Sequence, residues 1–267
     1  MCALPLESPL AALRVLRRDQ RGSSSPVVVE TVAGPYFVKL RGAAQGTAAL
    51  VAEVLVAELA DRLDLPVPPR RVITFSRDLP SNDLNDELAD LLQASVGENL
   101  GFRFLPTARD FRPEDLGRVT RDFASQVCWL DWLVLNPDRS PANPNILVDG
   151  SRLWLIDHGA ALPFQHDWES VTEATVLRPP LPVPHLLAST ATDLAAWDAL
   201  LTARLPRSAL AEAVAAIPDS FLEPLLAPGA GTDALKRRRA AYLALLWKRL
   251  QGPHRFGNWI AAPAAIP

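Results

Sequence analysis

The N-terminal part of the chain alternates short hydrophobic runs with Gly and Pro. Residues 26–30 and 35–40 are rich in β-branched and aromatic side chains, and residues 72–75 have a similar composition. Short runs of this kind, bounded by Gly and Pro, are typical of β-strands. The pattern therefore predicts a small β-sheet near the N-terminus.

Helical spacing first appears after the second of these runs. Hydrophobic residues recur every four positions from Val51 to Leu63, which indicates a helix with one stripe facing the core. Thr47 can cap this helix, and we expect it to end at about Asp64, ahead of a proline. Residues 83–94 also have a helical pattern.

Helices dominate the pattern in the rest of the chain. From Pro113 to Val134, apolar residues follow one another at three- and four-residue spacing, which predicts one long core helix. Similar patterns predict helices around 192–203, 207–215 and 233–250. Strands followed by helices in separate parts of a chain favour an α+β fold.

A glycine-containing apolar segment, residues 97–105, lies between the β-rich and the helical parts. Its position suggests a hinge whose backbone could hold an adenine by hydrogen bonds. The chain has 267 residues, which is long enough for one large domain or for two lobes.

A second β signal lies near the middle of the chain, where Asp149 and Gly150 separate two apolar runs. Asp-Gly in this setting is the strongest short-range signal for a hairpin. If these two residues form the turn, counting outward places Asn143 opposite Ile156, with Asp157 one position further out. We therefore expect the hairpin to bring Asn143 and Asp157 together.

Polar residues around this hairpin have the order and spacing of a kinase catalytic centre. Asp138 precedes Asn143 by five residues, and Asp157 follows the second apolar run. Phosphoryl transfer from ATP needs a carboxylate to position the attacking hydroxyl, and an Asn and a second carboxylate to hold Mg²⁺ on the phosphates. Each residue alone could be an ordinary turn residue, because Asn and Asp tolerate turn geometry. The complete set favours a catalytic Asp138, with Asn143 and Asp157 binding the metal and the nucleotide.

A lysine near the end of the second predicted strand and a glutamate in the next helix form another kinase-like pair. Lys39 could hold the phosphates of ATP while Glu53 fixes its amine. Glu58 is in the same helix, but Arg62 is four residues further on and can pair with it. The order of these residues relative to Asp138 favours Lys39 and Glu53 as nucleotide-binding residues.

Ser23 and Ser24 lie in a polar segment just before the first predicted strand. Such a segment could cover the phosphates of ATP, although it lacks both the GxGxxG fingerprint and the P-loop signature. A polar surface turn would have the same composition. Both interpretations stay open, and Ser23 and Ser24 count as candidate nucleotide-binding residues.

Composition and charge fit a globular protein without a nucleic-acid role. Hydrophobic residues make up 49% and charged residues 21% of the chain, and the formal net charge is −3. That charge provides no general attraction for nucleic acid. The basic residues within 236–249 are better explained as a solvated helix face.

Cysteine usage and the N-terminus suggest a soluble, cytoplasmic protein. The two cysteines, Cys2 and Cys128, cannot form a disulfide framework, and Cys128 is expected to be a buried free thiol within a helix. The N-terminus does not look like a signal peptide. No apolar run approaches the ~20 residues that span a bilayer.

Several of these motifs resemble the HipA-like kinases. The resemblance covers about residues 36 to 165 and is most specific in the block that contains Asp138 and Asp157. It is carried by Glu53 and by residues 36–46, 63–68, 136–145 and 153–162.

The resemblance implies a two-lobed, protein-kinase-like fold that is distantly related to phosphoinositide kinases. It would have a small β-rich N-lobe over residues 1–102 and a mainly helical C-lobe over residues 103–267. By matching position, it also implies ATP and Mg²⁺ as cofactors and assigns roles to five residues: the catalytic Asp138, the Mg²⁺ ligands Asn143 and Asp157, and the phosphate-contacting Lys39 with its supporting Glu53.

The motif block departs from the family pattern at two positions. Ser140 stands where larger family members often carry His after Asp-Arg, and His158 replaces the Phe of Asp-Phe-Gly. Control of the loops around the site is therefore expected to differ.

Three functions are compatible with these motifs. The leading one is an ATP- and Mg²⁺-dependent kinase that phosphorylates Ser or Thr of a protein. The second is a kinase for a small molecule or a lipid headgroup, because Asp-Arg followed by Asn also suits phosphoinositide-type kinases. The third is a pseudokinase or nucleotide-binding interaction module, against which the intact Asp138, Asn143 and Asp157 argue. The acceptor, transfer of AMP in place of phosphate, and the oligomeric state stay open.

Overall fold

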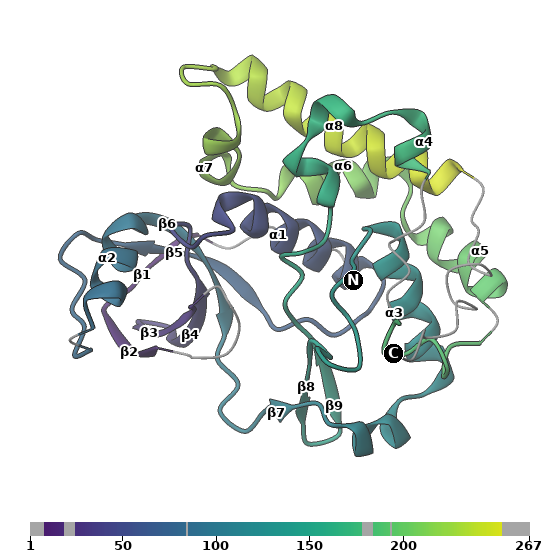
Figure 1. Ribbon diagram of the computed structural model, residues 1–267, viewed down its shortest axis with the longest axis horizontal. Helices are drawn as coiled ribbons and strands as arrows, with labels where there is room; N and C mark the ends of the chain where they lie inside the picture. The colour runs from purple at the N-terminus through teal and green to yellow at the C-terminus, as the bar shows by residue number, and fades with distance from the viewer. Residues whose placement is uncertain (1–7, 19–24, 84, 178–183, 193, 253–267) are drawn as a thin grey trace.

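An N-terminal mixed β-sheet followed by helices gives the protein an α+β fold (Figure 1). This computed structural model describes residues 8–18, 25–83, 85–177, 184–192 and 194–252. In Figure 1 the larger sheet lies on the left and most of the helices lie on the right and at the top. Among the described residues, no helix is both long and apolar enough to cross a bilayer.

The larger sheet contains the three predicted strands and three others. Its order is β1 (Leu10–Ala11), β5 (Arg70–Phe75), β6 (Gly97–Arg103), β4 (Gly34–Lys39), β3 (Val27–Thr31) and β2 (Arg14–Arg18). All neighbours are antiparallel except β1 and β5, which are parallel. The edge strands β1 and β2 had no clear sequence signal, because β1 has two residues and three of the five residues of β2 are arginines.

The predicted hinge at residues 97–105 is wrong for most of its length, because Gly97–Arg103 is strand β6, paired on both sides. Close packing, not flexibility, explains its second glycine. A Cβ atom at Gly101 would lie only 2.5 Å from Cγ1 of Ile73 on the neighbouring strand. The chain leaves the sheet only after Arg103.

Helix α1 (Gly46–Arg62) is buried on all sides, whereas the sequence predicted one core-facing stripe. Every residue from Thr47 to Ala60 is buried. The helix belongs to the large core with α3 (Arg121–Leu133) and the C-terminal helices. It contacts α6 (Arg207–Ala215) and α7 (Asp219–Leu222). The sheet has a separate, smaller core with α2 (Asp86–Ala94). Helix α1 therefore lies between the two parts of the molecule.

The long helix predicted from Pro113 is interrupted. A 3₁₀ segment, Pro113–Arg118, comes first, and α3 (Arg121–Leu133) starts afterwards. Thr120 caps α3, because its side-chain oxygen accepts the N–H of Phe123 at 3.2 Å. Capping by Thr competes with continuation of a helix through this position. As predicted, Cys128 on α3 is a buried free thiol.

The predicted hairpin is present, but its register differs from the expected one. Strands β8 (Ile146–Asp149) and β9 (Arg152–Leu155) pair with Asp149 opposite Arg152, so Gly150 and Ser151 form the turn. Gly150 takes the first turn position with a positive φ of 58°, which Gly adopts without strain. The shift places Asn145, not Asn143, opposite Ile156, and the Ile156 N–H donates to the Asn145 carbonyl at 3.1 Å. Strand β7 (Arg109–Asp110) completes this second sheet.

The C-terminal part is helical, as its apolar spacing predicted. Its basic residues are largely engaged within the molecule: Arg239 pairs with Asp219, Lys248 with Glu173, and buried Arg249 donates to backbone carbonyls at the end of α3. The helices are α4 (Glu173–Val176), α5 (Leu194–Arg204), α6 (Arg207–Ala215), α7 (Asp219–Leu222) and α8 (Thr232–Gln251).

Candidate active site

Lys39 stands at the centre of the site, where three segments of the chain meet. It is the last residue of β4, and its side chain is 10% exposed. Its Nζ donates to Oε1 of Glu53 on α1 and lies 2.5 Å from Oδ1 of Asp157, just after β9. The ion pair predicted between Lys39 and Glu53 is therefore present, and Asp157 joins it.

Burial and charge shift the pKa of all three groups. Burial lowers the pKa of Lys39, but Glu53 and Asp157 outweigh this effect, so the net pKa is raised and the amine stays charged. Burial raises the pKa of Glu53 despite the nearby ammonium. Burial would also raise the pKa of Asp157, but attraction to Lys39 brings it below its ordinary value. Of the two carboxylates that bond Lys39, Asp157 is therefore the one that stays ionised more readily.

The loop that carries Asp157 packs closely against α1. A Cβ atom at Gly159 would lie 3.3 Å from Cβ of Ala49 and 3.5 Å from Oε1 of Glu53. Glycine therefore allows the Asp-His-Gly turn to approach the helix closely. His158 is fully buried, and burial lowers its pKa to about 3, so its ring is neutral.

Two asparagine side chains hold Asp138 on the loop after α3. The amide of Asn143 donates to Oδ1 of Asp138 at 2.9 Å. The amide of Asn145 donates to the Asp138 carbonyl at 2.7 Å and to its Oδ2 at 3.2 Å. Asn136 accepts the backbone N–H of Asp138 at 3.1 Å. The carboxylate is therefore oriented before any substrate binds.

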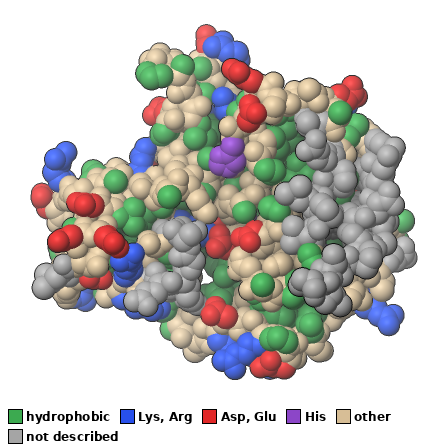
Figure 2. Space-filling view, viewed as in Figure 1, with side chains coloured by type: hydrophobic (Ala, Val, Ile, Leu, Met, Phe, Trp, Pro, Cys, Tyr) green, Lys and Arg blue, Asp and Glu red, His purple; other side chains and the backbone are tan. Residues whose placement is uncertain are grey.

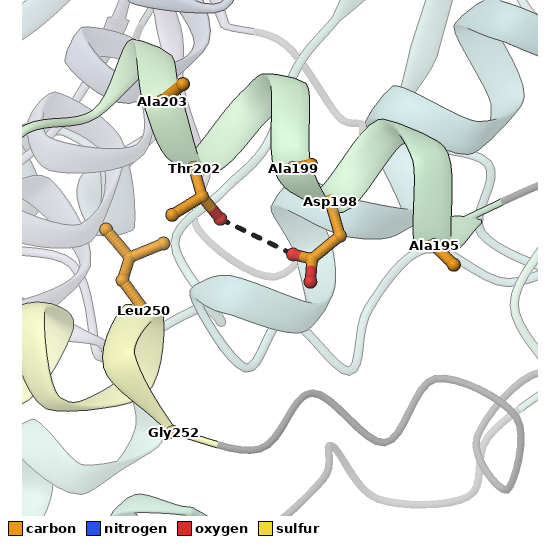
Figure 3. Close-up of a pocket in the computed structure, with 7 residues that line it drawn as sticks. All are labelled: Ala195, Asp198, Ala199, Thr202, Ala203, Leu250 and Gly252. Atoms are coloured by element: carbon orange, nitrogen blue, oxygen red, sulfur yellow. Dashed lines mark hydrogen bonds between the residues drawn. The ribbon is translucent and has the colours of Figure 1, made fainter.

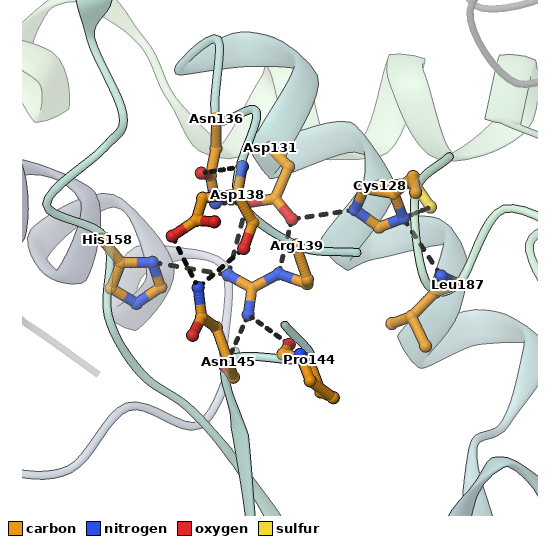
Figure 4. Close-up of polar contacts among 10 residues, drawn as sticks. Cys128, Asp131, Asn136, Asp138, Arg139, Pro144, Asn145, His158 and Leu187 are labelled. Atoms are coloured by element: carbon orange, nitrogen blue, oxygen red, sulfur yellow. Dashed lines mark hydrogen bonds and ion pairs between the residues drawn. The ribbon is translucent and has the colours of Figure 1, made fainter. Parts of the chain in front are cut away.

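A buried ion pair connects this loop to α3 (Figure 4). Nε of Arg139 donates to Oδ2 of Asp131 at 2.6 Å, and neither side chain is exposed. Arg139 also donates to the Asn145 carbonyl at 2.6 Å and reaches Nδ1 of His158 at 3.5 Å. Burial alone would raise the pKa of Asp131, but Arg139 and His185 bring it far below its ordinary value.

Left-handed backbone is concentrated around these loops. Among the described non-glycine residues, six have positive φ, and four of them are Leu135, Asn145, Asp157 and Leu162. Such conformations cost of order 1–3 kcal/mol each and cluster at functional sites, where the surrounding structure enforces them. The clustering supports a functional role for the loops on both sides of the hairpin.

The residues present fit a magnesium ion. Mg²⁺ prefers oxygen ligands and usually binds one or two carboxylates plus substrate phosphates. Asp157 supplies an ionised carboxylate, and its side chain is 41% exposed. Asn143 is exposed and its amide nitrogen bonds Asp138, so its amide oxygen could serve as a further ligand.

The structure places the predicted residues in two adjoining groups. Lys39, Glu53 and Asp157 form the first, and Asp138 with Asn143 forms the second. Two contacts connect these groups. One is the hairpin hydrogen bond from Ile156 to Asn145, and the other is the contact between His158 and Arg139. Ser23 and Ser24 lie outside the described residues.

Sequence reasoning missed Asn145, Asp131 and Arg139 as parts of this site. Asn145 had a signal, because it lies between Asn143 and the predicted strand, close in sequence to Asp138, which it bonds. Asp131 also had one: it is an acidic residue inside the apolar pattern of α3, and such a residue needs a buried partner.

Figure 2 shows acidic side chains beside the hollow between the sheet on the left and the helices on the right.

A separate cavity of about 490 Å³ lies between α5 and the end of α8 (Figure 3). Its lining is mostly small and apolar, with Asp198 and Thr202 as the polar members. None of the candidate active-site residues lines it.

Comparison with known proteins identifies the family. A family model described as HipA-like kinase matches residues 12–223, which include all the candidate residues described above. The chain belongs to the HipA-like kinase family. No curated protein matches the chain. Membership of the HipA-like kinase family indicates a kinase that uses a nucleotide. The match ends before α8, the long C-terminal helix.

Proposed function

We propose that this HipA-like kinase transfers the γ-phosphoryl group of ATP, with Mg²⁺, to a Ser or Thr hydroxyl of a protein. The observation that carries the proposal is the position of Lys39, whose ammonium bonds both Glu53 on α1 and Asp157 after the hairpin. Kinases need a lysine fixed by a helical glutamate next to the metal-binding aspartate. The choice of a protein acceptor rests on the family resemblance.

Lys39 is proposed to bind the phosphates of ATP. Its raised pKa keeps it cationic at neutral pH, and Glu53 fixes the direction of its amine. Phosphate oxygens would replace Asp157 as its second partner. Asp157 would then be free to hold Mg²⁺ together with Asn143. The metal neutralises charge on the phosphates during transfer.

Asp138 is proposed to orient the acceptor hydroxyl. Asn143 and Asn145 each donate to one of its two carboxylate oxygens, so the group is held in one orientation. Each carboxylate oxygen has a second lone pair and can still accept a hydrogen bond from a substrate hydroxyl. The alcohol proton would move to Asp138 as the new P–O bond forms and the bond to ADP breaks.

Labelled ATP tests this proposal directly. The purified chain would be incubated with Mg²⁺ and either α- or γ-labelled ATP, in the presence of a mixture of soluble proteins or of phosphoinositide vesicles. Label from γ-labelled ATP on protein Ser or Thr, located by mass spectrometry, is the expected result. Asp138→Asn should abolish most of it, whereas Asp233→Asn on the exposed start of α8 should not.

The other outcomes identify the alternatives. Label only from α-labelled ATP would mean AMP transfer, and label on the vesicles would mean a lipid kinase. Binding of ATP with no transfer to any acceptor would favour a nucleotide-binding interaction module.

A further inference from the structure

Asp131 connects α3 to the loop that carries Asp138. Its side chain is fully buried, and both of its oxygens bond residues of that loop. Oδ2 accepts from Nε of Arg139 at 2.6 Å, and Oδ1 accepts from Nδ2 of Asn136 at 2.8 Å. The geometry of the loop therefore depends on how the Asp131 carboxylate is held.

His185 is a further partner of that carboxylate, and it lies 54 residues further along the chain. Its Nε2 lies 2.9 Å from Oδ2 of Asp131. Its Nδ1 accepts the backbone N–H of Leu187 at 3.1 Å and lies 3.3 Å from Sγ of Cys128. Because Nδ1 accepts a hydrogen bond, Nε2 carries the ring proton in the neutral imidazole. The Nε2–H then donates a hydrogen bond to Asp131.

The same segment also holds the backbone of Arg139. The N–H of Leu186 donates to the Arg139 carbonyl at 2.9 Å. Arg139 in turn donates to the carbonyl of Asn145, whose amide holds Asp138. We propose that His185 is a positioning residue, which keeps Asp138 in its transfer geometry through Asp131 and Arg139. This role rests on the proposed phosphoryl transfer.

Loss of the His185 donor should disturb the loop more than the nucleotide side of the site. A buried carboxylate that loses a hydrogen bond pays a desolvation cost and can recover it only by reorienting. Reorientation of Asp131 would move Arg139 and, with it, the loop. Lys39, Glu53 and Asp157 lie outside this loop, so most contacts to ATP should persist even if Asn143 shifts.

A matched pair of variants tests the donor. In His185→Asn, the shorter side chain can still accept from Leu187 but no longer reaches Asp131, whereas in His185→Gln an amide N–H can reach it. For His185→Asn we expect kcat to fall by about 10- to 100-fold with KM for ATP changed less than about threefold, since a 1 Å misplacement of reacting groups can cost about 10². His185→Gln should recover most of kcat. His166→Asn, at an exposed position, is the control.

Hydrogen exchange gives a readout that does not need an acceptor. Peptides that cover residues 136–146 should exchange faster in His185→Asn than in the wild-type chain or in His185→Gln. The proposal is overturned if His185→Asn has wild-type kcat and exchange, or if both variants lose melting temperature and activity equally, as a purely structural role would give. A wild-type chain that transfers no phosphate would refute the proposed function, while the exchange comparison would still decide the role of His185.

Discussion

Nζ of Lys39 lies 2.5 Å from Oδ1 of Asp157, although 118 residues separate them in the sequence. The contact joins the end of β4 to the loop that follows the hairpin. Glu53 on α1 bonds the same ammonium. The Lys39 ammonium therefore joins the sheet, helix α1 and the loop after the hairpin.

Binding of ATP should depend on a divalent metal. Mg²⁺ with ATP should stabilise the protein by about 2–3 kcal/mol at a ligand concentration of about a hundred times Kd. Asp157→Asn should lose the metal-dependent part, because a neutral amide is a poorer Mg²⁺ ligand, while Asn still tolerates the left-handed backbone there. Thermal melting with ATP and either Mg²⁺ or EDTA measures the effect. Equal stabilisation in EDTA would refute the metal site.

Asp138→Asn should separate binding from chemistry. The substituted amide keeps the size of the carboxylate but cannot take the proton of the acceptor. We expect ATP affinity within a few fold of wild type and transfer slower by about 10²–10⁴, the usual range for a positioned acid or base. Single-turnover kinetics together with nucleotide titration measure both quantities. Transfer at the wild-type rate would rule out this role for Asp138.

Lys39 and Glu53 should be strongly coupled. Lys39→Met and Glu53→Gln should each lower kcat/KM for ATP, but the double variant should be little worse than Lys39→Met, because the carboxylate acts through the amine. Coupling between contacting residues is typically about 0.5–3 kcal/mol.

The control for this cycle is Glu58, which lies on the same helix and is also buried. Glu58 bonds Arg62 and Arg70 instead of Lys39. Lys39→Met combined with Glu58→Gln should therefore be additive in kcat/KM. Additivity for Glu53 as well would show that the ion pair does not act in the reaction.

His158 should make the protein less stable in mild acid. Its pKa is about 3 in the folded protein, against 6.5 in an unfolded chain, because burial disfavours the charged ring. Between these two pH values only the unfolded state binds the proton. The contribution of His158 to the free energy of unfolding is therefore fully present above pH 6.5. Below that pH it decreases by up to about 1.4 kcal/mol for each unit by which the pH is lowered. Urea unfolding between pH 7 and pH 4.5 should show a steeper loss for wild type than for His158→Phe. Parallel curves would contradict a buried neutral ring.

Local patterns in the sequence determined the elements and much of the chemistry. Predicted strands 26–30 and 35–40 and helix 207–215 match the structure closely, because β-branched runs and helical apolar spacing are local signals. The kinase-like residues could be named for a similar reason: their order and spacing along the chain are visible without a fold. Their roles stay predictions, to be tested as described above.

Beyond the predicted Lys39–Glu53 pair, only the tertiary structure decided which of these residues contact one another. Whether α1 is buried on one stripe or on all sides depends on α6 and α7, far along the chain. The hairpin register depended on whether Gly150 is the first or the second residue of the turn. Its positive φ places it first, and the Asp-Gly dipeptide alone did not predict this. Asp131, Arg139 and His185 come together only because a charge buried by folding must find partners in space, wherever they lie in the sequence.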